Sequence, residues 1–209
     1  MKGLLLKDFY VMRFMLILSA IITIGFCFSA QYSMLVFGFV WTVLVPISLH
    51  AYDVRCKWTE MEKMFPCKTI DLVFSNYLVG YIGLIGVAVI ELLMNVILTN
   101  CIDYYNDIIE LSAVLKLVII LFFAGVIALA LMNPPLLMFN QRGYTAVMAI
   151  FGGIIGFLGG FFEDELPILF QRISETSVLK LTLIATVIAI PISVLSVFIS
   201  YKVYIKKKG

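Results

Sequence analysis

Six long apolar segments constrain the fold of this chain more than any other feature. They cover residues 14–30, 33–49, 72–99, 113–132, 144–162 and 178–203. Each is long enough for a helix across the hydrocarbon core of a bilayer, which needs about 17 to 25 residues. A water-soluble chain that is 63% hydrophobic and 13% charged could not bury them all. The sequence therefore predicts an all-α, polytopic membrane protein, with six transmembrane helices in one domain that covers residues 1–209.

The basic residues predict how these helices are oriented. If the chain crosses the membrane six times, most of its 15 lysines and arginines lie on one side. Those on this side are Lys2, Lys7, Arg13, Arg55, Lys57, Lys63, Lys68, Arg142, Lys202, Lys206, Lys207 and Lys208, and those on the other side are Lys116, Arg172 and Lys180. Lysine and arginine accumulate in cytoplasmic loops. We therefore expect both termini, and the segment between the second and third helices, to be cytoplasmic.

The first 13 residues carry charges among leucines and aromatic residues. The charged side chains are Lys2, Lys7, Asp8 and Arg13, and they do not gather on one helical face. We interpret residues 1–13 as an interfacial helix that precedes the first span. A signal peptide is the competing interpretation of the first span, and it is disfavoured because no soluble domain follows.

The longest polar interruption covers residues 51–71, between the second and third apolar segments. At 100° per residue, Trp58, Met61 and Phe65 fall on one stripe of a short helix. The charged residues off this stripe are Arg55, Glu60, Glu62 and Lys63. Pro66 then ends the helix. We expect an amphipathic helix outside the bilayer.

Local signals predict two helix limits. Thr69 can cap the helix that leads into the third span, and Asp71 in its first turn is favoured by the helix dipole. The sequence Asn133-Pro134-Pro135 should stop the fourth span, because two consecutive prolines remove two backbone donors. We therefore expect helices over residues 72–99 and 113–132 inside the membrane.

The sequence lacks the residue patterns of a membrane enzyme. No nucleophile with a base, paired acids or histidines at metal-ligand spacing is present, and no glycine-rich phosphate loop occurs. The single histidine, His50, lies at the end of the second span and needs no catalytic role. The four cysteines follow no metal or redox spacing: Cys27, Cys56, Cys67 and Cys101. We expect a non-catalytic chain that binds no cofactor or metal.

Two features inside the apolar segments suggest further roles. Glu91 is the one acid within an apolar run, and Asn95 follows one turn later on the same face. This pair marks either a translocation path or a position that reaches the outer interface. Three glycines repeat at four-residue spacing: Gly152, Gly156 and Gly160. Such a strip lets another helix approach closely, either within the monomer or in a dimer.

The chain also resembles the permease subunits of ATP-binding-cassette type-2 exporters. The resemblance is carried by residues 1–10 (Met-Lys-Gly-Leu-Leu-Leu-Lys-Asp-Phe-Tyr), Tyr52-Asp53, Lys57-Trp58, Pro66, Asp71, Tyr77, and residues 135–140 with Arg142. Within this family it is similar to a small group that includes the phenol-soluble modulin exporter permease. Val54, Thr69, Asn76 and Asn140 depart from the residues usual in such permeases.

The resemblance implies a function and partners. In that family, the cytoplasmic helix between spans two and three is a coupling helix that docks on a separate ATPase subunit. Its contacts would here be Asp53, Arg55, Lys57, Trp58, Glu60, Met61, Lys63 and Phe65, with the large apolar side chains as anchors and the charged ones as a rim. ATP and Mg would be bound by the partner ATPase. A helix that lies on the inner membrane surface is the alternative.

The resemblance also implies a setting for transport. A second permease, identical or related, would complete the central path in the cell membrane of a bacterium. Substrates would be amphipathic peptides or other hydrophobic molecules, moved out of the cell. A stand-alone six-span carrier, or a membrane scaffold or assembly protein, remains the alternative. An ATPase encoded by an adjacent reading frame would distinguish the exporter from both.

Overall fold

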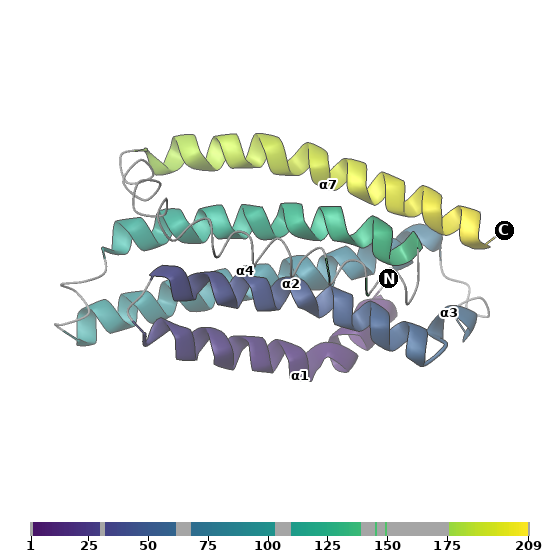
Figure 1. The fold of residues 1–209 in the computed structure, drawn as a ribbon, viewed down its shortest axis with the longest axis horizontal. Helices are drawn as coiled ribbons and strands as arrows, with labels where there is room; N and C mark the ends of the chain where they lie inside the picture. Colours follow the sequence, from purple (N-terminus) through teal and green to yellow (C-terminus); the bar gives the residue numbers. More distant parts are fainter. Residues whose placement is uncertain are drawn as a thin grey trace.

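The computed structural model describes residues 2–29, 32–61, 68–102, 110–138, 145, 149 and 176–208. Within this part of the chain the regular structure is helical and contains no strand. The helices are α1 (Lys2–Cys27), α2 (Tyr32–Arg55), α3 (Trp58–Met61), α4 (Thr69–Cys101), the Leu111–Met138 helix and α7 (Val178–Lys208). All but α3 lie side by side in an elongated bundle (Figure 1). The predicted all-α architecture is confirmed for the described residues.

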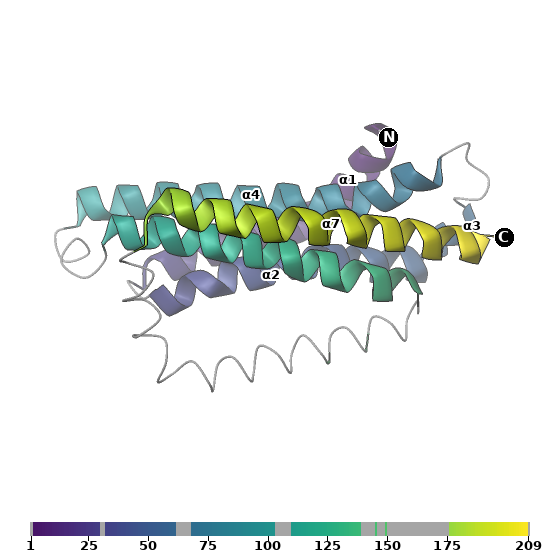
Figure 2. The ribbon, with the colours of Figure 1, turned by 90° about the horizontal axis from the view of Figure 1, so that it is seen from above.

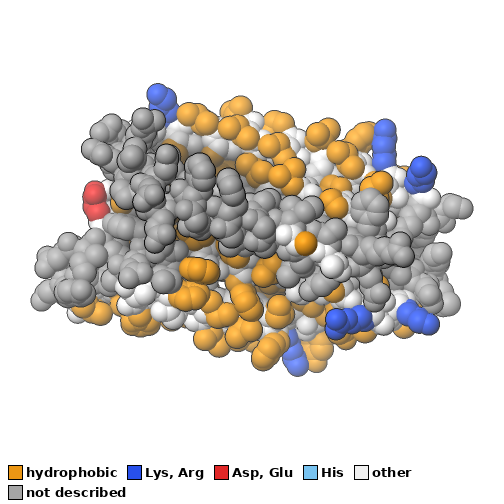
Figure 3. Space-filling model, in the orientation of Figure 1, with side chains coloured by type: hydrophobic (Ala, Val, Ile, Leu, Met, Phe, Trp, Pro, Cys, Tyr) orange, Lys and Arg blue, Asp and Glu red, His pale blue; other side chains and the backbone are white. Residues whose placement is uncertain are grey.

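Five of these described helices are long and apolar enough to cross a membrane. They are α1, α2, α4, the Leu111–Met138 helix and α7. The expected span over residues 144–162 lies outside the described residues, and so do Gly152, Gly156 and Gly160. Hydrophobic side chains cover much of the described surface in view, and most of the visible lysines and arginines lie toward its ends (Figure 3). Such a surface suits contact with lipid, because lipid tails need no polar partners.

Helix α4 holds the bundle together. It contacts α1, α2 and α7, and the main apolar core joins it to α2 and the Leu111–Met138 helix. The core residues of these three helices are Leu35, Phe39, Val43, Ile47, Leu84, Val87, Leu98, Val114, Leu117, Val118, Leu129, Met132 and Leu136. A smaller cluster joins α4 to α1 and α2 through Met12, Val45, Leu49 and Val79. Helix α4 takes part in both clusters, as α2 does, and it also contacts α7.

Glycines allow the central helices to approach closely. A Cβ atom at Gly80 of α4 would lie 2.7 Å from a methyl group of Leu129 and 2.9 Å from Cγ of Pro46. A Cβ atom at Gly83 would lie 2.9 Å from Cγ2 of Thr42. Small residues at such crossings let helix backbones pack tightly in membranes. The sequence analysis singled out a different glycine strip and missed these two positions.

The termini of the helices differ from the expected limits. Helix α1 is continuous through residue 13, so the expected interfacial segment and the first span form one helix, whose N-terminal end turns away from the bundle (Figure 2). Helix α2 continues to Arg55, beyond the expected end at residue 49. Lys68 occupies the N-cap position of α4 without a side-chain cap bond, so Thr69 is the first helical residue and not the cap. Asp71 in the first turn is confirmed.

The prediction that Asn133-Pro134-Pro135 stops the fourth span is wrong, because the helix continues to Met138. A proline at position 134 cannot donate to the carbonyl of Ala130, four residues earlier. The hydroxyl of Ser196 in α7 donates to this carbonyl instead. Neighbouring helices commonly satisfy carbonyls freed by prolines in membrane helices. The tertiary contact therefore removes part of the penalty on which the predicted stop depended.

Candidate functional site

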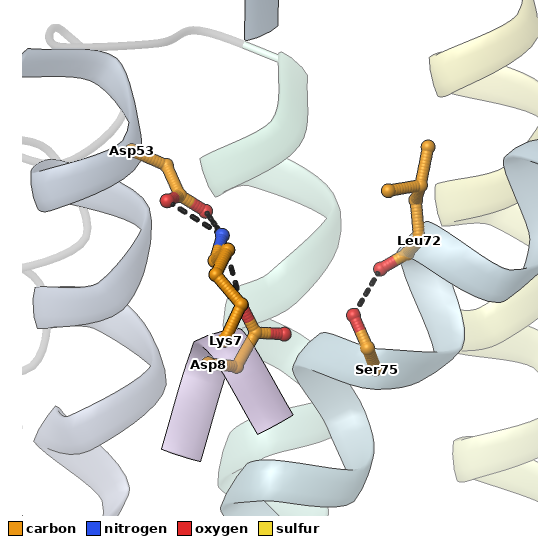
Figure 4. A network of polar contacts seen from close by, with 5 residues as sticks. All are labelled: Lys7, Asp8, Asp53, Leu72 and Ser75. Carbon is orange, nitrogen blue, oxygen red and sulfur yellow. Dashed lines mark hydrogen bonds and ion pairs between the residues drawn. The ribbon is translucent and has the colours of Figure 1, made fainter. Parts of the chain in front are cut away.

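A compact ionic cluster lies where α1 meets the end of α2. The Lys7 ammonium of α1 donates to both carboxylate oxygens of Asp53, at 2.9 Å and 3.1 Å. It also lies 2.9 Å from a carboxylate oxygen of Asp8 (Figure 4). The side chains of Lys7, Asp8 and Asp53 are 22%, 3% and 15% exposed. One ammonium group thus serves two largely buried carboxylates, in surroundings that screen charge less than water does.

The same ammonium contacts the short helix α3. Nζ of Lys7 lies 4.3 Å from the centroid of the Trp58 ring. A cation over an indole face is attracted by the ring quadrupole, by about 0.5 to 2 kcal/mol depending on solvation. Lys7 therefore contacts residues from α1, α2 and α3 at once.

The turn between α2 and α3 has a defined backbone. The amide of Cys56 donates to the carbonyl of Tyr52 at 2.9 Å, and that of Lys57 donates to Val54 at 3.2 Å. Lys57 has a φ of 53°, the left-handed conformation that reverses the chain direction. This turn places Trp58 over Lys7.

A small cavity of about 40 Å³ opens beside the ionic cluster. Its lining includes Lys7, His50, Ser75 and Tyr204, so α1, α2, α4 and α7 all reach it. The hydroxyl of Ser75 donates to the carbonyl of Leu72 at 3.0 Å (Figure 4). A space of this size holds water molecules and is too small for a peptide. The cavity thus lies at a junction of four helices, beside the ionic cluster.

The Glu91–Asn95 pair lies elsewhere, inside the contact between α1, α2 and α4. Glu91 and Asn95 are both 0% exposed. The Asn95 amide donates to the carbonyl of Glu91 at 2.8 Å. Neither carboxylate oxygen of Glu91 has a hydrogen-bond partner within the described part of the chain. Glu91 therefore does not reach an exposed interface in this structure.

A glycine makes room for this carboxyl group. A Cβ atom at Gly38 of α2 would lie 2.8 Å from Oε1 of Glu91 and 2.8 Å from Oγ1 of Thr23 in α1. The Thr23 hydroxyl donates to the carbonyl of Ser19 at 2.7 Å. The three helices thus meet at a small polar contact. No group of three or more His, Cys, Asp or Glu side chains suited to a metal ion occurs among the residues that the structure describes.

Comparison with known families identifies the kind of protein. Residues 3–205 match the model of a family described as ABC-2 family transporter protein. The chain belongs to the ABC-2 transporter family. Members are membrane components of ABC transporters and are normally non-catalytic, and such a component implies an ABC ATPase partner in general. No curated protein and no solved structure matches the chain. Together with its apolar helices, the family makes this ABC-2 chain a multi-pass membrane protein.

The structure places the expected ATPase contacts of the ABC-2 chain in two groups. Asp53 and Trp58 are partly buried and contact Lys7. Arg55, Lys57 and Met61 are exposed, and Met61 is 49% exposed. The side chain of Glu60 lies outside the described residues, and so do Lys63 and Phe65. The expected amphipathic stripe is therefore open to a partner at Met61 and turned toward its own chain at Trp58.

Sequence reasoning missed Lys7 as a site residue. It was counted among the charges of an interfacial helix, and its partner Asp53 was assigned to the rim of an interface. The two residues are 46 positions apart, and no periodicity relates them. The sequence offered one signal for their ion pair, because the two residues carry opposite charges and were both predicted at the cytoplasmic surface of the membrane.

Proposed function

We propose that this chain is the membrane-spanning permease subunit of an ATP-driven exporter that works with a separate ATP-binding-cassette ATPase. The match of residues 3–205 to the ABC-2 family carries this proposal. The partner ATPase binds ATP and Mg and supplies the energy. The permease contributes the path, and it moves because ATP has different affinities for the conformations of the complex.

Residues 51–71 form the coupling loop, with α3 as the described part of the coupling helix. Exposure of Arg55, Lys57 and Met61 supports a docking surface at this loop. Lys202 and Lys206 in the last turns of α7 are exposed as well, and α3 and the C-terminus lie at the same end of the bundle (Figure 1). The positive-inside rule makes this end the cytoplasmic one, where an ATPase is available.

A sixth span over residues 144–162 completes the permease. The Leu111–Met138 helix and α7 run in the same direction, so the first ends and the second begins at opposite ends of the bundle (Figures 1 and 2). If the chain crosses the membrane once more between these two helices, it returns to the end at which α7 begins. With six spans, the N- and C-termini are both cytoplasmic.

The substrates are amphipathic peptides or other hydrophobic molecules, and two permeases, identical or related, enclose the path. The composition supports this class, because 63% hydrophobic residues leave few charged groups to line a path. Similarity to the group of the phenol-soluble modulin exporter permease points to the same substrates.

Reconstitution tests the proposal. The chain is co-expressed with an ATP-binding-cassette ATPase encoded by an adjacent reading frame, purified and placed in proteoliposomes. We expect the two proteins to co-purify and to transport a fluorescent amphipathic helical peptide only when ATP is hydrolysed. Transport by the permease alone, driven by an ion gradient, would instead establish a secondary carrier. If the two proteins do not associate and no transport is observed, a scaffold is favoured.

A further inference from the structure

The Lys7 ammonium joins three helices near the proposed cytoplasmic end. It is bonded to Asp53 at the end of α2, to Asp8 in α1 and to the ring of Trp58 in α3. The remainder of α1 is packed on the bundle, because Met12 shares an apolar cluster with Val45, Leu49 and Val79. One side chain thus connects the α2–α3 turn to a helix that is itself fixed to α2 and α4.

The two carboxylates at this contact require a cation at position 7. Asp8 and Asp53 share one ammonium, and both are largely buried. Without the ammonium, two carboxylates would stand close together in a medium that screens them poorly. An exposed ion pair contributes little, whereas removal of one partner from a buried cluster is costly. The turn should therefore move away from α1 when position 7 loses its charge.

We infer that Lys7 is a positioning residue, which holds the α2–α3 turn on α1 so that movement of the coupling loop is transmitted to α1. The inference rests on the proposed function for the origin of that movement. The geometry of the contact itself does not depend on it. Lys7 transmits force through the ion pair with Asp53 and orients α3 through Trp58.

Tryptophan fluorescence tests the contact on the permease alone. The chain has two tryptophans, so Trp41→Phe leaves Trp58 as the only tryptophan, which is excited selectively at a wavelength that tyrosine does not absorb. In detergent or nanodiscs, we expect Lys7→Met to increase quenching of Trp58 by acrylamide, a neutral quencher that ignores the altered charge. Lys180→Met, at an exposed lysine near the start of α7, should leave quenching unchanged. Lys7→Arg should keep it close to the parent value, because arginine also pairs with carboxylates and stacks on rings.

A charge exchange separates positioning from general destabilisation. Lys7→Asp combined with Asp53→Lys keeps one cation and two carboxylates at the contact. It should therefore lower the quenching of Trp58 relative to Lys7→Asp alone, although position 7 no longer places a cation over the Trp58 ring. If Lys7→Met fails to fold, Asp53→Asn is used instead. This variant removes the carboxylate of α2 and keeps the ion pair of Lys7 with Asp8 within α1. The inference would be overturned by unchanged quenching in folded Lys7→Met or Asp53→Asn. It would also be overturned by a folded exchange variant whose Trp58 is quenched as strongly as in Lys7→Asp alone.

The complex with the ATPase tests transmission. We expect the amount of amphipathic peptide transported per bound ATPase to fall in Lys7→Met. The charge exchange should transport more peptide per bound ATPase than Lys7→Asp alone. Normal transport by Lys7→Met would refute transmission through this contact. If the parent permease does not bind the ATPase at all, the proposed function fails, and the fluorescence experiment still decides whether Lys7 holds the turn.

Discussion

The hydroxyl of Tyr77 in α4 lies 2.6 Å from the hydroxyl of Ser196 in α7, and both are buried. Ser196 uses its single hydrogen for the carbonyl of Ala130, so it can only accept from Tyr77. Tyr77 in turn must accept from Ser200, 2.8 Å away. The bonds therefore run from Ser200 through Tyr77 and Ser196 to Ala130, the carbonyl that Pro134 leaves without a helical donor.

This directed chain makes Ser196→Ala a sensitive change. It removes the donor to the Ala130 carbonyl and the acceptor for the Tyr77 hydroxyl together. We expect the free energy of unfolding to fall by about 1 kcal/mol, within the range of interhelical hydrogen bonds in membrane proteins. Reversible unfolding in mixed detergent micelles measures the loss. Ser200→Ala should lower the free energy of unfolding by less, because Ser200 is the first donor of the hydrogen-bonded series and its loss leaves the other two bonds intact.

Pro134→Ala provides the control for this explanation. An alanine at position 134 supplies the N–H that can donate to Ala130, so Ser196→Ala should cost less in that background than in the parent. Equal losses in both backgrounds would show that Ser196 does not compensate for the proline.

Gly38→Ala should destabilise the contact of α1, α2 and α4. Its Cβ atom would meet Oε1 of Glu91 and Oγ1 of Thr23 at 2.8 Å. Overpacking of this kind costs about 1 to 3 kcal/mol. The thermal unfolding temperature in detergent measures it. Gly86→Ala in α4 is the matched control, since its Cβ atom would meet nothing within 4 Å and alanine favours the helix.

Glu91→Gln tests whether this carboxyl group packs helices or lines a path. Glutamine has nearly the same shape, so we expect the variant to fold and to transport as the parent does, because Glu91 has no exposed surface in the structure. Transport in proteoliposomes, normalised to the amount of inserted permease, gives the answer. Reduced transport with normal insertion would instead place Glu91 on the translocation path.

Met61→Glu tests the docking surface. A charge on this half-exposed side chain should abolish co-purification with the ATPase while the permease stays inserted, because apolar anchors supply most of an interface's energy. Met61→Leu should retain the ATPase. Trp58→Glu should also release it, although this change disturbs the Lys7 contact too. Retention of the ATPase by Met61→Glu would contradict docking at α3.

Several parts of the candidate site could be predicted from the sequence, and their partners could not. The polar segment, the apolar stripe of Trp58 and Met61, and the buried acid Glu91 all follow from local patterns. The ion pair of Lys7 with Asp53 depends on how α1 packs beside α2. For the same reason, the contact of Trp58 with Lys7 could not be predicted from the apolar stripe.

The proline stop failed for a related reason. Pro134 and Pro135 carry a real local cost, and a local analysis ends the helix there. Ser196 lies 66 positions from Ala130 and supplies the missing donor. A local penalty predicts a break only when no other helix offsets it.

By itself, the sequence determined that this chain is a helical membrane protein and approximately where its described helices lie. The bilayer sets the length and polarity of a span, so these properties are encoded locally. The packing of the helices determines that Lys7 meets Asp53, that Gly38 leaves room for Glu91, and that Ser196 donates to the carbonyl that Pro134 leaves free. Such contacts depend on the rotation and register of whole helices, which are set by the summed packing of many residues.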